Sequence, residues 1–356
     1  MKITYTEALI KMCEEGNCLD SLDYVYGKAI LAAVSENHNF IRYIGAGLEG
    51  VLLLAEDVKN MRRVVFKFAK PKLDTGKKIF GYKNIKIFSR RNKNTDLKET
   101  GDSKRFLRAC KLQQEISRII RNDAEIQLIG DVPIIYQIGN IPKLYVEMEY
   151  IPGADLLSWC KAEQSLYKRV EIIYKLSIFI NKALHLNYIV HGDLKPNNFI
   201  ITGTSDNYKI HVIDFGGTKN LKETIEVTQD ECMHSVPFTS KNQYTNFIGR
   251  SYIDDLYSIG VMLYYCVIQK NPAEQVADFP DAKTFKELHP QRLIDDFTIL
   301  GCFNRAVGIG LKYTKLQTFI DDLDKRYLKI HKKTEKKQFN FIQIEDIWRD
   351  FLGEKT

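Results

Sequence analysis

Short apolar runs, broken by glycines and polar residues, fill the part of the chain that follows residue 38. Their β-branched and aromatic residues are typical of strands, and the breaks between them are typical of turns. Between the third and fourth runs, apolar residues recur every three or four positions over 104–121, which predicts a helix. The predicted strands are residues 40–44, 51–54, 64–66, 133–138 and 144–150.

Beyond Pro152 the hydrophobic pattern becomes helical. It predicts helices over 168–187, 254–268 and 341–352, while residues 1–38 predict a helical extension. We therefore expect an α+β fold of two lobes, a small β-rich lobe with one helix and a larger α-helical lobe. The expected boundaries are 1–38 for the N-terminal extension, 39–151 for the N-lobe, 152–330 for the C-lobe and 331–356 for a C-terminal helical tail.

The composition is that of an ordinary globular protein, with 356 residues, 44% hydrophobic content and a net charge of +7. The longest apolar run, Ile259–Ile268, is too short to span a bilayer and predicts a buried helix. The chain starts without an apolar signal segment, and its seven cysteines include no CxxC pair, which indicates free thiols in a reducing compartment. We expect a cytoplasmic protein, or one in a host cytosol if it is a secreted effector or a viral enzyme.

Residues 70–103 form a polar insertion that is rich in lysine and asparagine. From Lys67 to Lys93 the chain has ten Lys or Arg residues against one acidic residue, Asp74. We favour the interpretation that this segment is a solvated loop. The alternative is a docking surface over 70–93 for an acidic partner, a lipid headgroup or nucleic acid.

The segment from His191 to Asn198, with the sequence HGDLKPNN, carries the strongest chemical signal. Asp193 can accept the proton of a substrate hydroxyl, and Lys195 can neutralise charge on a transferred phosphoryl group. Asn198 and Asp214 offer oxygen ligands of the kind that Mg²⁺ prefers. Phosphoryl transfer needs positioning and charge neutralisation more than covalent help, so this set predicts a phosphotransferase.

A glycine-rich stretch over 45–50 and a lysine at the end of a strand add to this prediction. The glycines permit backbone N–H groups to approach phosphate, although a plain hairpin turn explains them equally well. Lys67 ends an apolar strand, where a buried ammonium needs an anionic partner. ATP phosphates and Glu115 of the predicted helix would serve, with Glu125 as a weaker rival.

Taken in their order along the chain, these residues resemble the eukaryotic-type serine/threonine protein kinases over about residues 40–330. The resemblance implies ATP and Mg²⁺ as cofactors, with Mn²⁺ as an alternative ion, and a protein substrate. It implies that Asp255 anchors the backbone of the catalytic loop. The catalytic residues that it implies are Asp193 as base, Lys195, Lys67 and Glu115, and the metal ligands are Asn198 and Asp214. The nucleotide-binding residues that it implies are Gly45, Gly47, Gly50, Val51, Val65, Lys67, Met148, Glu149, Ile151, Asp155 and Ile200.

Two departures from the family pattern bear on regulation and on substrate. Gly192 stands where the family usually has arginine, which indicates an enzyme that does not strictly depend on phosphorylation of its activation loop. The Ala-Pro-Glu that usually closes that loop is replaced by residues 237–243, and the combination resembles the casein kinase I and vaccinia-related kinase group. Two other functions stay open, a small-molecule phosphotransferase of the aminoglycoside or choline kinase type and a pseudokinase that acts as a binding module.

Overall fold

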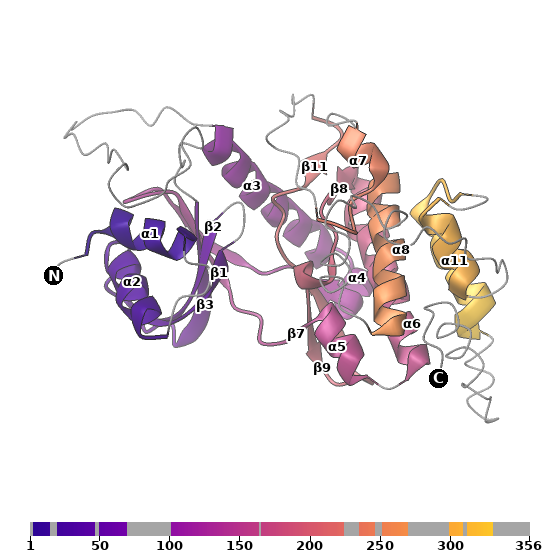
Figure 1. Ribbon diagram of the computed structural model, residues 1–356, viewed down its shortest axis with the longest axis horizontal. Helices are drawn as coiled ribbons and strands as arrows, with labels where there is room; N and C mark the ends of the chain where they lie inside the picture. The colour runs from indigo at the N-terminus through magenta and orange to yellow at the C-terminus, as the bar shows by residue number, and fades with distance from the viewer. Residues whose placement is uncertain are drawn as a thin grey trace. The chain divides into compact units, whose positions relative to one another are not determined.

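A computed structural model describes residues 3–14, 20–46, 50–69, 101–163, 165–223, 235–245, 251–269, 299–308 and 312–329. The predicted glycine-loop residue Gly47, most of the insertion 70–103 and the predicted helix 341–352 lie outside these residues. The chain divides into two compact units (Figure 1). The first comprises Met1–Lys111 and Ile134–Tyr150, and the second comprises Leu112–Pro133 and Ile151–Thr356.

The first unit is built on a five-stranded antiparallel sheet with the strand order β1-β2-β3-β6-β5. All five strands predicted from the hydrophobic pattern are confirmed. Their bounds are β1 (His38–Ala46), β2 (Gly50–Asp57), β3 (Arg62–Ala69), β5 (Ile135–Gly139) and β6 (Tyr145–Glu149).

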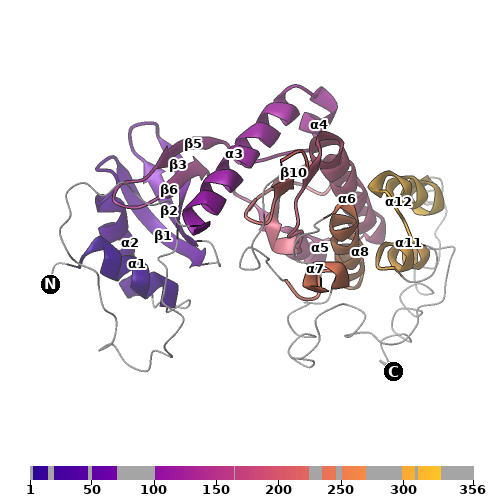
Figure 2. The ribbon, with the colours of Figure 1, turned by 90° about the horizontal axis from the view of Figure 1, so that it is seen from above.

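Helices pack on both faces of this sheet, because successive side chains of a strand point to opposite faces. On one face, Val64, Phe66 and Phe68 share a core with residues of α1 (Tyr5–Glu14) and α2 (Asp20–Ala32), as Figures 1 and 2 show. On the other face, Ala69 and Val146 pack with the start of α3 (Gly101–Arg121). The predicted helical character of the first 38 residues and the predicted helix 104–121 are both confirmed.

The second unit is mainly helical, and together with the sheet of the first unit it confirms the predicted α+β fold of a β-rich and a helical lobe. The helix predicted over 168–187 is α6 (Leu166–Phe179), which continues through a π turn (Ile180–Leu184) and a 3-10 turn (His185–Asn187). The run Ile259–Ile268 lies in α8 (Tyr252–Ile268), with buried side chains from Ile259 to Val267. The other helices are α4 (Ala124–Ile129), α5 (Leu156–Ala162), α7 (Lys241–Thr245), α11 (Ile299–Ala306) and α12 (Leu316–Leu323), with a 3-10 turn at Pro196–Asn198 and a π turn at Asp324–Leu328.

Two small sheets of the second unit carry the segments with the predicted chemistry. One has the order β4-β10-β9-β7, with β4 (Gly130–Asp131) parallel to β10 (Tyr208–Val212), and β9 (Phe199–Gly203) between β10 and β7 (Ala154–Asp155). The other pairs β8 (Ile189–Val190) with β11 (Lys219–Asn220).

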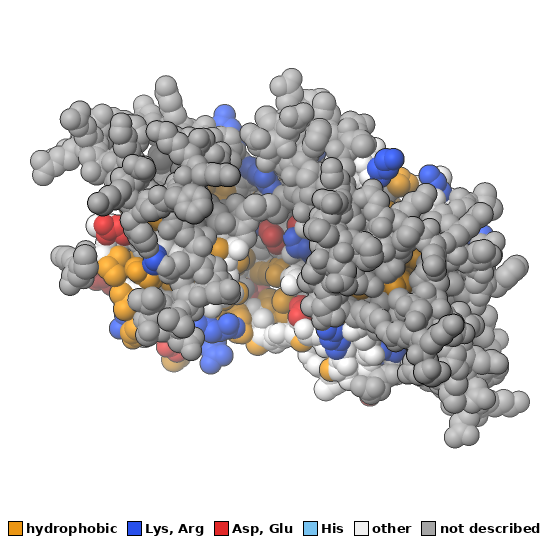
Figure 3. Space-filling view, viewed as in Figure 1, with side chains coloured by type: hydrophobic (Ala, Val, Ile, Leu, Met, Phe, Trp, Pro, Cys, Tyr) orange, Lys and Arg blue, Asp and Glu red, His pale blue; other side chains and the backbone are white. Residues whose placement is uncertain are grey.

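The exposed side chains and the cysteines bear on what the composition predicts. Hydrophobic side chains also reach the surface of the first unit, beside lysines and arginines (Figure 3), and the exposed ones include Tyr24, Val25 and Ile41. In the part of the chain that the structure describes, no helix combines the length and the apolar character that spanning a membrane requires. In the described part of the chain, Cys110, Cys160, Cys266 and Cys302 are buried and form no disulfide.

Candidate active site

Asp255 of α8 holds the loop that joins β8 to β9. Its carboxylate is fully buried and accepts the backbone N–H groups of His191 and Gly192, each at 2.8 Å. The Nε2 atom of His185 lies 3.0 Å from the same carboxylate. The prediction that Asp255 anchors this loop is therefore confirmed.

The charge states around this anchor follow from burial and hydrogen bonding. Burial alone would raise the pKa of the Asp255 carboxyl, but the hydrogen bonds from His185 and from the Gly192 N–H lower it overall. Desolvation lowers the pKa of the buried His191 imidazole, against the opposing influence of Asp255 and Asp193. At neutral pH Asp255 is thus ionised and His191 is neutral, so His191 supports the loop as an uncharged, buried ring.

Asp193 lies between a cation and a hydroxyl group. Lys195 Nζ donates to Asp193 Oδ2 at 2.7 Å, and Ser235 Oγ donates to Asp193 Oδ1 at 2.8 Å. Lys195 Nζ also donates to Ser235 Oγ at 3.1 Å, which closes a triangle of polar contacts. Both oxygens of the Asp193 carboxylate are therefore oriented, one by an ammonium group and the other by a hydroxyl group.

The backbone segments that carry Asn198 and Asp214 are neighbours in space. The side-chain amide of Asn198 donates to the Asp193 carbonyl at 2.7 Å, which leaves the amide oxygen as an acceptor. The N–H of Ile213 donates to the Asn198 carbonyl at 2.9 Å, so the residue after Ile213 begins next to Asn198. That residue, Asp214, has a φ of +62°, the left-handed conformation that non-glycine residues adopt only where the surroundings impose it. One amide oxygen and one carboxylate form a donor set that fits Mg²⁺.

The segment 235–243 is connected directly to this loop. Gln243 Nε2 donates to the Gly192 carbonyl at 3.0 Å, and the Ser235 N–H donates to Thr239 Oγ1 at 2.7 Å. Sequence reasoning missed Ser235 and Gln243 because they contact the loop from 42 and 51 positions away, and no local spacing marks such pairs.

In the first unit, the predicted nucleotide-binding residues of β3 and β6 share one face of the sheet. Val65 pairs with Met148, and Lys67 lies two residues along the same strand, on the face where α3 packs. Val51 does not share this face, because its fully buried side chain belongs to the core beside α1 and α2. Its neighbour Leu52, which pairs with Lys67, lies on that face instead.

The glycines of the predicted phosphate loop are partly described. Gly45 lies in β1 opposite Leu52, and an added Cβ there would meet nothing within 4 Å. At Gly50, a Cβ would lie 2.3 Å from the Phe68 carbonyl oxygen, so strand packing alone requires glycine at this position.

The predicted nucleotide-binding residues near the end of β6 and in β7 and β9 differ in their hydrogen bonds and positions. The Glu149 N–H donates to the Ile134 carbonyl at 2.8 Å. Asp155 caps α5, because its Oδ1 accepts the N–H groups of Leu157 at 3.1 Å and Ser158 at 3.0 Å. Of the remaining predicted residues, Ile151 lies in the loop before β7, and Ile200 pairs with Asp155 across β9 and β7.

The structure separates Glu115 and Lys67 into different units. Glu115 is a half-buried residue in the part of α3 that belongs to the second unit, while Lys67 belongs to the first. Their pairing remains a prediction. The rival Glu125 forms an ion pair with Lys182 on α6's continuation, which accounts for its charge.

Known proteins match this chain over most of its length. The family described as protein kinase domain matches residues 39–299. The serine/threonine-protein kinase PrkC of Bacillus subtilis (strain 168) is 26% identical over 241 residues, which cover 67% of this chain and 31% of that protein. A probable serine/threonine-protein kinase of Clostridium acetobutylicum is 31% identical over 157 residues, 43% of this chain and 23% of its own length. The chain thus spans less than a third of the length of these two relatives.

Proposed function

The chain belongs to the protein kinase family, and from this premise we propose that it is an ATP- and Mg²⁺-dependent serine/threonine protein kinase. The observation that carries the proposal is the arrangement of Asp193 between Lys195 and Ser235. A carboxylate whose two oxygens are oriented at 2.7 Å and 2.8 Å is suited to accept a proton from a substrate hydroxyl.

Each residue of the loop has a role in this proposal. Asp193 receives the proton of the attacking hydroxyl, and Lys195 stabilises negative charge on the transferred group. Asn198 and Asp214 would hold Mg²⁺ through an amide oxygen and a carboxylate. Bound Mg·ATP supplies the phosphoryl group and the cation that neutralises its charge. Lys67, with Glu115 as its proposed partner, would hold the nucleotide phosphates.

The contacts of segment 235–243 support an enzyme that does not strictly need a phosphorylated activation loop. Gly192 offers no side chain to bind a phosphate. Instead, the described end of the segment is held by Gln243 on the Gly192 carbonyl and by Ser235 on Asp193. Neither contact requires a phosphate group. Together with residues 237–243 in place of Ala-Pro-Glu, the glycine at position 192 favours membership of the casein kinase I and vaccinia-related kinase group.

We also propose residues 39–151 as the N-lobe and residues 152–330 as the C-lobe.

The test is phosphoryl transfer by wild type and by Asp193→Asn, measured with labelled ATP and a generic protein acceptor. Asn keeps the size of the side chain and removes the base, so we expect kcat to fall by roughly 10²- to 10⁴-fold while nucleotide affinity changes little. Asp206→Asn is the matched control, because this aspartate is exposed and pairs only with Lys168 among the ion pairs found for it. Autophosphorylation that survives in Asp193→Asn would contradict the role of the base, and turnover on small alcohols alone would contradict a protein substrate.

A further inference from the structure

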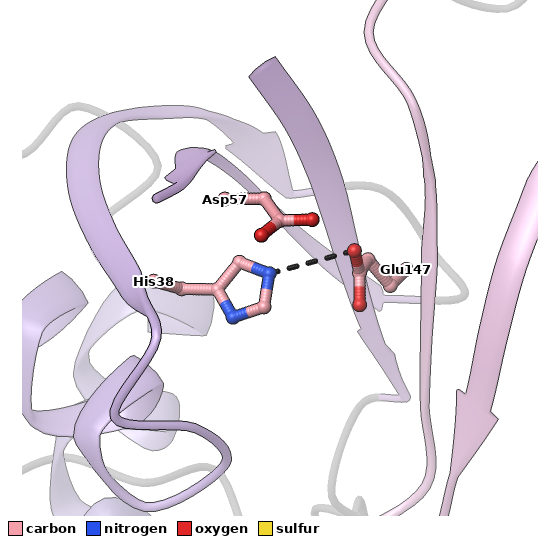
Figure 4. Close-up of side chains that lie close together, drawn as sticks. All are labelled: His38, Asp57 and Glu147. Carbon is pink, nitrogen blue, oxygen red and sulfur yellow. Dashed lines mark ion pairs between the residues drawn. The ribbon is translucent and has the colours of Figure 1, made fainter. Parts of the chain in front are cut away.

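Three ionisable side chains that the proposed phosphoryl transfer does not use meet on one face of the sheet in the first unit (Figure 4). His38 begins β1 and lies directly opposite Asp57, the last residue of β2. Glu147 lies on β6, opposite Phe66 of β3. One ligand atom from each of the three side chains lies within 4.8 Å of the others. This is the face that packs against α1 and α2, so the cluster is opposite to the face that carries Lys67.

The cluster is buried, and the Nε2 atom of its imidazole has no hydrogen-bond partner among the described residues. Asp57 is 2% exposed, Glu147 is 5% exposed, and the side chain of His38 is 10% exposed. Among the residues that the structure describes, His38 Nε2 has no hydrogen-bond partner although it is inaccessible to solvent. A buried polar atom without a partner is costly, and this one points at two carboxylates.

The distance across the cluster matches a pair of metal ligands better than a hydrogen bond. His38 Nε2 lies 3.4 Å from Glu147 Oε1, beyond the usual N–H···O range. Two ligands of a tetrahedral zinc ion, each bound at about 2.0–2.1 Å, are separated by about 3.3 Å. The separation of these two atoms is therefore compatible with their binding the same ion.

The second ring nitrogen of His38 has the partner that a metal-binding histidine requires. His38 Nδ1 lies 2.9 Å from Ser35 Oγ, and the Asn37 N–H donates to the same hydroxyl oxygen at 3.1 Å. A proton on Nδ1, donated to Ser35, leaves the lone pair of Nε2 facing Asp57 and Glu147. Fixing the tautomer through the far nitrogen is the usual arrangement around metal-bound histidine.

Arg62 contacts both carboxylates of the cluster, those of Asp57 and Glu147. Its Nε lies 3.2 Å from Asp57 Oδ2 and its Nη2 lies 3.8 Å from Glu147 Oε1, while the guanidinium stacks 3.4 Å from the centre of the Tyr136 ring. The N–H and Nδ2 of Asn60 also donate to Asp57, at 3.1 Å and 2.6 Å. These contacts hold the Asp57 carboxylate in place. One guanidinium nevertheless faces two buried carboxylates, so Arg62 alone does not balance their charge.

We propose that His38 Nε2, Asp57 and Glu147 bind one divalent transition-metal ion, for which zinc is the best match. Imidazole with carboxylates suits zinc and its neighbours, whereas Mg²⁺ and Ca²⁺ prefer oxygen ligands alone. Water completes the coordination shell of the ion. The ion joins β1, β2 and β6, and through Ser35 it also fixes the connection from α2 to β1. The site is structural, and it does not depend on the proposed kinase activity.

The test is a zinc titration of the full chain after treatment with EDTA, in excess Mg²⁺. Metal analysis of the wild type is expected to give one tightly held zinc per chain, with a higher midpoint of thermal unfolding than the metal-free protein. His38→Gln and Glu147→Gln are expected to lose both the bound zinc and the shift. Ser35→Ala is expected to weaken zinc binding by roughly 10- to 100-fold, because it keeps the three ligands and removes the hydroxyl that contacts the far nitrogen of His38.

Two control variants separate this site from other metal-binding groups. Asp214→Asn removes a proposed Mg²⁺ ligand, and His211→Gln removes a partly buried histidine of the second unit, so both variants are expected to retain the zinc. Circular dichroism of the metal-free variants checks that they fold. Cobalt substitution of the wild type gives a readout that needs no variant, namely visible bands of nitrogen and oxygen ligation without thiolate charge transfer. A wild type that binds no zinc, zinc that remains in His38→Gln, or thiolate bands would each overturn the proposal.

Discussion

At position 192 the backbone adopts a φ of +76°, in the left-handed region that residues with a Cβ avoid. This conformation lets two successive N–H groups, those of His191 and Gly192, reach the same Asp255 carboxylate. An arginine, which the family usually has here, would carry a positive charge but would also strain the backbone. Glycine at position 192 therefore permits the hydrogen bonds to Asp255, and it provides no side chain to bind a phosphate group.

A substitution at this position tests that argument. We expect Gly192→Ala to lower the free energy of unfolding by about 1 kcal/mol, the usual cost of placing a Cβ in left-handed backbone. Urea denaturation measures the change. Gly45→Ala serves as the control, because an added Cβ there meets no atom within 4 Å. Equal losses in both variants would show that the backbone conformation at 192 is not the cause.

Ser235 offers a second test, in catalysis. Ser235→Ala removes the hydroxyl that orients Asp193 Oδ1 and accepts from Lys195, so we expect kcat to fall roughly 10-fold, about 1.4 kcal/mol in the barrier. Ser235→Thr keeps the hydroxyl and is expected to retain most of the activity. Steady-state kinetics with a protein acceptor separates kcat from KM. If the alanine and threonine variants lose activity equally, the hydroxyl is not what orients the base.

Residues that act through local spacing could be predicted from the sequence, and residues that act at a distance could not. Asp193, Lys195 and Asn198 lie within six positions, and the side chains of Lys195 and Asn198 both contact Asp193, at its carboxylate and at its backbone carbonyl. Ser235 and Gln243 contact the same loop from distant positions, so their role emerges only in the fold. Val51 was misplaced for a simpler reason. Its neighbour Leu52 is equally apolar, and only the register of β2 against β3 shows which of the two shares a face with Lys67.

At the scale of elements, α1 and α2 form part of the core of the sheet unit. Leu9 and Met12 of α1, with Ile30 and Leu31 of α2, are almost completely buried against the strands. Their burial removes apolar surface from water on a face that would otherwise be exposed. The sequence predicted the helices from their apolar groups but gave no sign of where those groups would pack.

Removing one of these contacts should destabilise the whole unit. We expect Leu9→Ala to lower the free energy of unfolding by about 2–5 kcal/mol, the usual cost of truncating a buried leucine. Alanine is a good helix former, so α1 itself is not weakened. The control is Val25→Ala on α2, where the valine is 46% exposed and the expected change is within about 0.5 kcal/mol. Similar denaturation midpoints for wild type and Leu9→Ala would contradict the packing of α1 on the sheet.

Strand length explains why the shortest strands were not predicted, although β9 and β10, with five residues each, were not predicted either. The five strands of the first sheet have five to nine residues, long enough for their β-type composition to be recognised. Strands β4, β7, β8 and β11 have two residues each and carry no periodicity. They exist because neighbouring segments, such as the buried β10, offer backbone groups for pairing.

At the scale of the whole molecule, the chain passes between the two compact units three times, and the expected break near Pro152 falls next to the last passage, between Tyr150 and Ile151. The other two passages lie inside α3, between Lys111 and Leu112, and between Pro133 and Ile134. The passage inside α3 could not be predicted, because the helical pattern runs through it without interruption. A helix that contributes to two units shows no change of periodicity at the boundary.

Two buried histidines, His191 and His211, contribute to the dependence of the molecule's stability on pH. Burial, aided by the charge of Lys209, lowers the pKa of His211 to about 4, from about 6.5 in the unfolded chain. Burial lowers the pKa of His191 as well. Between about pH 4 and about pH 6.5, the unfolded state binds more protons at His211 than the folded state. The stabilisation from neutral His211 is therefore complete above about pH 6.5 and is lost as the pH falls toward 4.

Urea denaturation between pH 7.5 and pH 4.5 can test this dependence on the full chain, with EDTA present so that metal binding does not contribute. We expect the free energy of unfolding to decrease as the pH falls, and to decrease less steeply in His211→Gln. Glutamine retains a hydrogen-bonding group for Thr202, whose Oγ1 lies 3.0 Å from His211 Nε2, but it cannot titrate. Because the substitution removes the titration at position 211, equal slopes in the two proteins would mean that His211 takes up its proton equally well in the folded and unfolded states. The acid sensitivity would then come from other groups with a lowered pKa, among them His191 and, at lower pH, Asp57 and Asp255.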